Sequence, residues 1–203
     1  ELKFNVGAIT HLIEDLKSFS TKTNIIVVTN PVDEITNYLR IMLNKENVLG
    51  FGLELDAKRY EKFLGKRTFC IGTHGKAIPL INSTNEKEYD SLSKKTDNSL
   101  LEYIREHGIP HKMAGANFKE FFEKLTGKKK EIIHISFYLK KDFLGARDVS
   151  ISLPCEVKDG KILTVAKFQV NDIERKRFLD SVKELKKSVE HIIETHKRLI
   201  DYK

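Results

Sequence analysis

The spacing of apolar residues divides the first half of the chain into short strands and amphipathic helices. Continuously apolar runs, typical of strands buried on both faces of a parallel sheet, occupy residues 24–30, 48–52 and 67–72. Apolar residues at helical spacing of three and four occupy residues 5–18, 32–43 and 55–64. Because helices and strands alternate, this half predicts right-handed α/β crossovers.

The pattern changes in the second half of the chain. A long polar helix is expected at 86–107, ending at Gly108 with Pro110 beyond it, and a shorter one near 115–125, ending at Gly127. Strand-like segments follow at 132–139, 149–154 and 162–168. The dipeptide Asp159-Gly160 is a strong hairpin signal, so the last two of these strands are expected to be antiparallel. Apolar residues then recur at three and four from Phe178 to His196, which predicts one long C-terminal helix.

Composition indicates a folded protein and argues against two classes of partner. Apolar residues make up 40% of the 203 residues, which is enough to fill a core. The net charge of +7 permits nucleic-acid binding, but the lysines are scattered. The one dense run, Lys128–Lys130, follows Gly127, where a solvated turn is expected, and no basic patch is interleaved with aromatic residues. No run of about 18 apolar residues exists. We therefore expect neither a nucleic-acid partner nor a membrane span.

Cysteine usage and the N-terminus bear on the cellular setting. Cys70 and Cys155 lie far apart in apolar runs, so we interpret both as reduced core thiols. They are too few for a disulfide framework or a zinc site, and no metal is expected. The first residues lack a signal-peptide pattern, which favours a cytoplasmic protein. Since the chain opens with Glu1 rather than Met, it is expected to be a fragment or a processed product.

Polar residues that could carry chemistry follow the ends of three predicted strands. Asn30 lies where ligands bind in open α/β sheets, although it could simply cap the next helix. Asp56 and Arg59 share one helix face, and the arginine could grip a carboxylate, although a surface ion pair would look the same. His74 is flanked by glycines and could serve as a general acid/base, or be an exposed loop residue. The other histidines are interpreted as structural or solvated: His11, His107, His111, His134, His191 and His196.

Taken in order, these motifs resemble the lactate/malate dehydrogenase family. The resemblance rests on Asn5, VVTNPVD at 27–33, LDAKRY at 55–60 and GTHG at 72–75, and continues into the hairpin and last helix. It implies that His74 exchanges the substrate proton and that Asp56 orients and charges it. It implies that Arg59 binds the substrate carboxylate and that Asn30 contacts both the substrate and the nicotinamide. It further implies that Asn5, Val28 and Thr29 line the cofactor, NAD or NADP.

The same resemblance implies an architecture. Residues 1–53 would be the remainder of a Rossmann-type NAD-binding domain, and residues 54–203 an α+β catalytic domain with antiparallel strands. The family's Gly-rich turn is missing, because no GxGxxG occurs anywhere in the chain. The chain alone is therefore expected to be inactive.

The function implied is a 2-hydroxy acid dehydrogenase acting on a small 2-hydroxy or 2-keto acid, as a homodimer or homotetramer. Ala114, near a pocket position that tends to be smaller in malate enzymes, favours malate over lactate. Two departures from the family pattern, Lys76 after the His-Gly pair and a short stretch from Arg59 to His74, keep a second possibility open. In that alternative the chain is a non-catalytic relative that serves as an assembly module.

Overall fold

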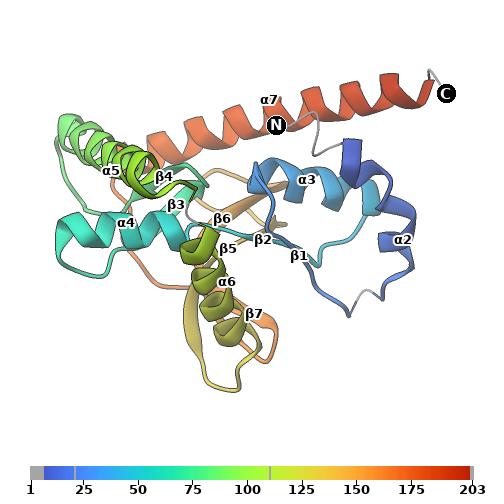
Figure 1. The fold of residues 1–203 in the computed structure, drawn as a ribbon, viewed down its shortest axis with the longest axis horizontal. Coiled ribbons are helices and arrows are strands. Elements are labelled where there is room, and N and C mark those ends of the chain that lie inside the picture. The colour runs from blue at the N-terminus through green and yellow to red at the C-terminus, as the bar shows by residue number, and fades with distance from the viewer. Residues whose placement is uncertain (1–6, 21, 110, 202–203) are drawn as a thin grey trace.

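A computed structural model of the chain describes residues 7–20, 22–109 and 111–201. Figure 1 shows its elements arranged around a central sheet. In chain order they are α2 (Ile13–Ser18), β1 (Ile25–Val27), α3 (Val32–Leu43), β2 (Val48–Phe51), α4 (Glu54–Leu64), β3 (Cys70–Thr73), β4 (Lys76–Pro79), α5 (Glu86–His107), α6 (His111–Thr126), β5 (Glu131–Leu139), β6 (Val149–Lys158), β7 (Lys161–Val165) and α7 (Asp172–Asp201).

The strands form one mixed sheet with the order β1-β2-β5-β6-β3-β4, and β7 also pairs with β6. Among the described strands only β1 and β2 pair in parallel, with Ile25 opposite Val48, so one crossover of the expected kind forms through α3. The expected continuation of that series is wrong: β3 does not join β2 but pairs antiparallel with β4 and β6. The place beside β2 is taken by β5, which arrives much later in the chain.

The second half confirms the expected antiparallel strands. β5 and β6 pair continuously from Glu131 opposite Val157 to Leu139 opposite Val149. The turn between β6 and β7 has positive φ at both Asp159 and Gly160, 51° and 74°, as a type I′ hairpin requires. The α/β architecture with antiparallel strands and a long last helix is therefore as expected.

Helices cover both faces of the sheet (Figure 1). α3 and α7 pack on one face, whereas α4 and α6 pack on the other. The main core lies between the sheet and these helices, and α7 contributes Phe178, Val182, Leu185 and Val189 to it. α3 lies so close to β2 that a Cβ added at Gly50 would stand 2.7 Å from Thr36 Oγ1. This close approach sets the position of the first turn of α3 over the sheet.

A buried glutamate fastens the start of α7 to the segment that follows β4. Glu174 is fully buried, and its Oε1 accepts hydrogen bonds from the backbone N–H groups of Ile81 and Asn82, each at 2.9 Å. The hydroxyl of Tyr89 on α5 donates to the same oxygen at 2.8 Å. Asn171 N–H donates to the other carboxylate oxygen at 3.0 Å. One side chain thus joins the start of α7 to the segment after β4 and to α5, both about 90 residues earlier in the chain.

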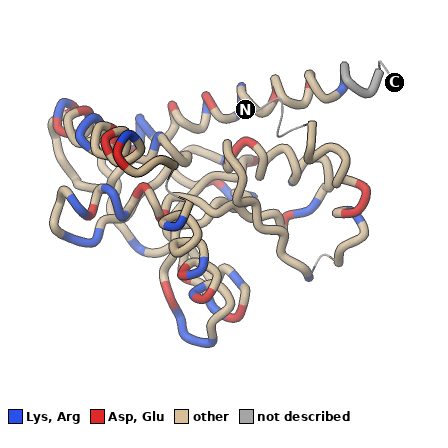
Figure 2. Tube along the Cα trace, viewed as in Figure 1, with Lys and Arg blue, Asp and Glu red and all other residues tan. Residues whose placement is uncertain are grey.

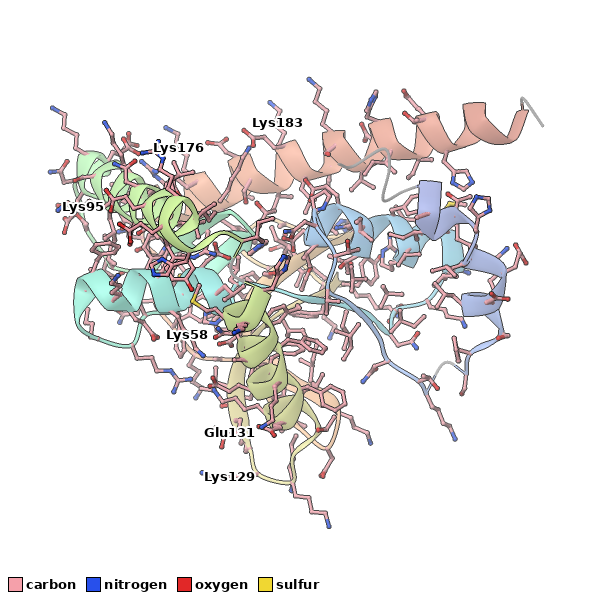
Figure 3. All side chains as sticks on the ribbon, viewed as in Figure 1. Lys58, Lys95, Lys129, Glu131, Lys176 and Lys183 are labelled. Atoms are coloured by element: carbon pink, nitrogen blue, oxygen red, sulfur yellow. The ribbon has the colours of Figure 1, made fainter. Side chains whose placement is uncertain are left out.

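Charged residues of both signs alternate over the helices and loops, as Figure 2 shows. Lys128, Lys129 and Lys130 are exposed in the bend before β5, as expected of a solvated turn. Lys129 extends away from the body of the molecule in Figure 3, and its Nζ lies 3.4 Å from Glu131. Among the described residues, no helix is long and apolar enough to span a membrane. Both cysteines are buried and unpaired, and no cluster of metal-ligating side chains occurs within the described ranges.

Candidate active site

The first turn of α4 directs two carboxylates to opposite sides of the helix. Glu54 and Asp56 follow directly after β2 and are separated by about 200° around the helix axis. Negative side chains are favoured at this end of a helix because its free N–H groups carry partial positive charge. Glu54 faces β5, whereas Asp56 faces the turn between β3 and β4.

The β3–β4 hairpin presents His74. Thr73 pairs with Lys76, so His74 and Gly75 are the two central residues of the turn. Gly75 has φ of 81°, a conformation that a side chain would strain, which explains glycine at this position. The sequence indicated a loop after the β3 strand and missed β4. The histidine therefore stands at the tip of a hairpin rather than in a free loop.

Three of the candidate residues come together at this tip. His74 Nδ1 lies 2.7 Å from Asp56 Oδ2, and the two side chains are only 20% and 6% exposed. Arg59 Nη1 lies 3.4 Å from the other oxygen of Asp56. Because Asp56 is buried, the pair with Arg59 is not the surface ion pair that the sequence left open. The short stretch between Arg59 and His74 does not prevent the contact.

The surroundings of His74 favour its protonated form. Burial lowers the pKa of the imidazole, but the hydrogen bond and charge of Asp56, with a smaller contribution from Asp33, outweigh burial and raise the pKa above 6.5. Arg59 opposes them weakly. Nε2 has no hydrogen-bond partner among the described residues. The site thus combines a proton-holding imidazole nitrogen, open on one side, with a nearby guanidinium.

Sequence reasoning missed a second carboxylate behind His74. Asp33, in the first turn of α3, is buried, and its Oδ2 accepts the backbone N–H of His74 at 2.7 Å. Its Oδ1 accepts the hydroxyl of Ser152 on β6 at 3.1 Å. Burial raises the pKa of Asp33 to about 6, against the hydrogen bonds from His74 and Ser152. The only signal in the sequence was its place three residues after Asn30 at the start of a helix.

The remaining candidates lie at the end of β1. Val28, Thr29 and Asn30 directly follow this strand and are exposed, so the segment is open to a ligand. The N-cap position of α3 is Pro31 rather than Asn30. Asp33 links this segment to the His74 turn through its bond to the backbone. Asn5 lies outside the described residues.

A groove runs beside the guanidinium of Arg59. It encloses about 360 Å³ between α4, α5 and α6, and its lining includes Arg59, Leu100, Tyr103 and Met113. Lys58 also lines the groove and links α4 to α6, with its Nζ 2.6 Å from both Asn117 Oδ1 and Glu120 Oε2 (Figure 3). Ala114 is the next residue of α6 after Met113, so it lies near the groove.

Lys76, the departure that favoured a non-catalytic relative, does not enter this cluster. Its ammonium group pairs with Glu184 on α7 at 2.8 Å, and both side chains are largely exposed. The ion pair therefore draws the lysine toward the surface of α7. No disruption of the His74–Asp56 contact results from it.

A second histidine–carboxylate pair lies on the other side of α4. His134 N–H donates to Glu54 Oε1 at 2.6 Å, and its Nδ1 lies 3.3 Å from the same oxygen. His134 Nε2 accepts the backbone N–H of Cys70 at 3.1 Å. His196 is also buried, with Nδ1 against the hydroxyl of Tyr38 and 3.3 Å from Thr10 Oγ1. The structural interpretation of His134 and His196 agrees with these contacts.

Comparison with known proteins places this arrangement in a family. Residues 54–196 match the family model described as lactate/malate dehydrogenase, alpha/beta C-terminal domain. The chain belongs to the lactate/malate dehydrogenase family. The model covers well over half of the chain, including α4 and the His74 turn.

Relatives within the lactate/malate dehydrogenase family carry both names. The chain is 24% identical to the L-lactate dehydrogenase of Shouchella clausii, over 96% of the chain and 68% of that protein. It is 26% identical to malate dehydrogenase 1 of Aquifex aeolicus, over 93% of the chain and 64% of that protein. The chain thus spans about two thirds of the length of these curated relatives.

Solved structures of this family share the fold. The malate dehydrogenase of Aeropyrum pernix superposes with a TM-score of 0.76 at 21% identity. The match covers 94% of the present chain and 72% of the Aeropyrum pernix chain. The malate dehydrogenase of Archaeoglobus fulgidus in complex with NADH superposes with a TM-score of 0.78 at 22% identity. The match covers 93% of the present chain and 68% of the Archaeoglobus fulgidus chain. The likeness concerns the fold alone at these identities.

Proposed function

We propose that the protein is an NAD(P)-dependent 2-hydroxy acid dehydrogenase that interconverts malate and oxaloacetate. The observation that carries this proposal is the His74–Asp56–Arg59 cluster, in which an imidazole nitrogen without a partner among the described residues stands beside a guanidinium. The names of the relatives, both malate and lactate dehydrogenases, support the 2-hydroxy acid class.

The chemistry divides between the substrate's two ends. Arg59 would bind the substrate carboxylate through two parallel hydrogen bonds. When bound, the nicotinamide would supply a hydride to C2 of the keto acid in the reducing direction. His74 Nε2–H would donate its proton to the C2 oxygen, so that a keto group becomes a hydroxyl and the imidazole becomes neutral. Asp56 would hold Nδ1–H and stabilise the charged imidazole before transfer. The raised pKa of His74 favours the donor form.

The end of β1 would hold the nicotinamide end of the cofactor. Val28, Thr29 and Asn30 are exposed where β1 ends, at the edge of the sheet where nucleotides bind in α/β folds. Asn30 would contact both the substrate and the nicotinamide, and the family resemblance gives Asn5 a role in lining the cofactor. The pyrophosphate needs backbone N–H groups at a Gly-rich helix start, and the sequence contains no GxGxxG. NAD and NADP are both compatible with these residues.

The preference for malate rests on α6. Ala114 follows Met113, which lines the groove beside Arg59, and a small residue near this position is what the family resemblance associates with malate enzymes. The test is the ratio of kcat/KM for oxaloacetate and pyruvate in the full-length protein with NADH or NADPH. A higher value for oxaloacetate supports malate, a higher value for pyruvate assigns the enzyme to lactate, and no turnover of either refutes the dehydrogenase.

Arg59→Lys tests the carboxylate grip directly. Lysine keeps the charge but loses the planar two-point contact, so kcat/KM for the keto acid should fall by roughly a hundredfold while NADH binding stays unchanged. Arg67→Lys, at an exposed position on the segment before β3, is the matched control. It should change neither kcat/KM for the keto acid nor NADH binding. An unchanged kcat/KM in Arg59→Lys would remove Arg59 from the site.

Residues 1–203 alone should bind NADH weakly and turn over neither substrate, because the pyrophosphate-binding turn is not among them. Calorimetric titration of this chain with NADH, together with an oxaloacetate assay, provides the test. Micromolar affinity or measurable turnover would contradict this part of the proposal. We further propose a homodimer or homotetramer for the full-length protein, which size-exclusion chromatography with light scattering would establish or refute.

A further inference from the structure

Asp33 joins three elements behind the His74 turn. It lies in the first turn of α3, and its two oxygens bond to different parts of the sheet: Oδ2 to the His74 N–H at 2.7 Å and Oδ1 to the Ser152 hydroxyl at 3.1 Å. Ser152 in turn pairs with Gly72, just before the turn. The contacts close a ring through α3, the β3–β4 turn and β6.

The ring has little freedom to relax. A Cβ added at Gly52 would stand 2.4 Å from Ser152 Oγ, so the serine is held closely against the residue that follows β2. The carboxylate itself is 1% exposed. A group that bonds the backbone of His74 from such a fixed place determines how the turn sits on the sheet, and thereby the direction of the imidazole.

Using a charged group to accept one backbone N–H requires a large desolvation free energy. A buried carboxylate costs far more to desolvate than a neutral amide that could accept the same bond. The charge also acts on the imidazole, where it adds to Asp56 from α4 against Arg59. The negative charge of the neighbouring Glu34 adds to burial in raising the pKa of Asp33. A charge at this place therefore contributes to how His74 holds its proton.

We propose that Asp33 is a positioning residue for His74, which fixes the β3–β4 turn against α3 and places a carboxylate behind the imidazole. The inference rests on the proposed role of His74 in proton transfer. Asp33 belongs to the same segment as Asn30, three residues earlier, so it also ties the candidate substrate amide to the candidate acid/base. A displacement of either would move the other.

The test compares two neighbouring variants on α3 in the full-length protein. Asp33→Asn keeps the shape and an acceptor oxygen but removes the charge. Asn37→Ala is the control: Asn37 is buried one turn further along and bonds the backbone of Ser150, also on β6, at 2.6 and 2.7 Å. Ser152→Ala is a milder second variant, since it removes only the bond to Oδ1 and would fold if Asp33→Asn does not.

Two readouts separate positioning from a structural role. NMR titration of the His74 imidazole should show a lower midpoint in Asp33→Asn, a smaller shift in the same direction in Ser152→Ala, and no shift in Asn37→Ala. For keto-acid reduction, kcat should fall by roughly tenfold or more in Asp33→Asn, with KM within about threefold of the parent, because Arg59 is untouched.

The outcomes distinguish this inference from the proposed function. An unchanged His74 midpoint in both Asp33→Asn and Ser152→Ala, or an equal shift in Asn37→Ala, would overturn the role of Asp33. A parent protein that reduces no 2-keto acid would instead overturn the dehydrogenase, while the imidazole titration would still decide whether Asp33 controls His74.

Discussion

Two histidines each contact a carboxylate from the first turn of α4. The two histidines differ in what their second ring nitrogen contacts. His74 lies against Asp56 and His134 against Glu54, on opposite sides of α4. His134 Nε2 accepts the N–H of Cys70, and a backbone N–H can only donate. His134 is therefore fixed with its proton on Nδ1, facing Glu54. His74 Nε2 has no such partner within the described part of the chain.

A histidine–carboxylate pair alone therefore does not indicate catalysis. Both pairs combine an acidic residue of α4 with a histidine from a strand or turn, and both are largely shielded from water, with His side chains 20% and 7% exposed. What differs is whether a proton can leave or arrive. His134 has both nitrogens committed to bonds within the protein, as in a structural cross-link, whereas His74 keeps one nitrogen for another molecule.

The largest expected difference concerns activity. In the full-length protein, Asp56→Asn should lower keto-acid reduction by about 10²- to 10⁴-fold, because the amide no longer stabilises the charged imidazole. Glu54→Gln, the matched change on the other side of α4, should leave kcat/KM within about threefold. Steady-state assays with oxaloacetate provide the measurement. Equal losses in the two variants would remove the distinction between the pairs.

A second difference is the added carboxylate, Asp33, on the His74 side. Its folded pKa of about 6 is above the ordinary 3.8, so its contribution to stability is fully present below pH 3.8 and is lost as pH rises through 6. This loss amounts to about 3 kcal/mol, because each tenfold change in proton affinity corresponds to about 1.4 kcal/mol. Asp33→Asn should therefore gain about 2 kcal/mol relative to the parent between pH 4 and pH 7.5, since part of the loss has already occurred at pH 4. Urea unfolding at both pH values measures it, and a pH-independent difference would contradict it.

The Glu54 side should show the opposite pH dependence. Burial raises the pKa of Glu54, but the hydrogen bonds from His134, with a smaller contribution from the charge of Lys124, outweigh burial and lower it below 4.5. Its contribution is thus present above pH 4.5 and is lost as pH falls through the folded pKa. Glu54→Gln should cost about 1–2 kcal/mol of unfolding free energy at pH 7, and less in acid. A cost that grows as pH falls would reverse this assignment.

The smallest effect is expected beside the His74 turn itself. Lys76 and Glu184 are 72% and 66% exposed, and exposed ion pairs contribute little. Lys76→Ala should leave kcat/KM within about twofold and the melting temperature nearly unchanged. A large loss of activity would show that Lys76 acts on His74 despite its contact with α7.

Local signals were sufficient for several elements of the fold. The helices expected at 32–43 and 86–107 coincide with α3 and α5, since periodicity and caps act within a few residues; Asn85, for example, caps α5 by accepting the N–H of Lys87. β4 was missed because Lys76–Pro79 becomes a strand only through pairing with β3. The place of β5 beside β2 depends on Gly50 meeting Ser136, a contact that no local pattern encodes.

The site divides in the same way. His74, Asp56 and Arg59 could be named because strand ends, glycines and helical spacing mark them locally, and the structure brings all three together. Asp33 looks in sequence like an ordinary acidic residue at a helix start, and its meaning comes from the β3–β4 turn folding over it. The roles of all these residues in catalysis, and those of Asn5, Val28, Thr29 and Asn30, stay predictions.

The buried Glu174 has a consequence for the order in which the chain folds. Its bond to the Ile81 N–H closes a loop of 93 residues, so neither end gains from the contact until the strands between them have formed. The segment after β4 should consequently become ordered late, when α7 docks. In hydrogen-exchange measurements on the native protein, the Ile81 and Asn82 amides should open together with the start of α7, as one cooperative unit, although they are about 90 residues away in sequence.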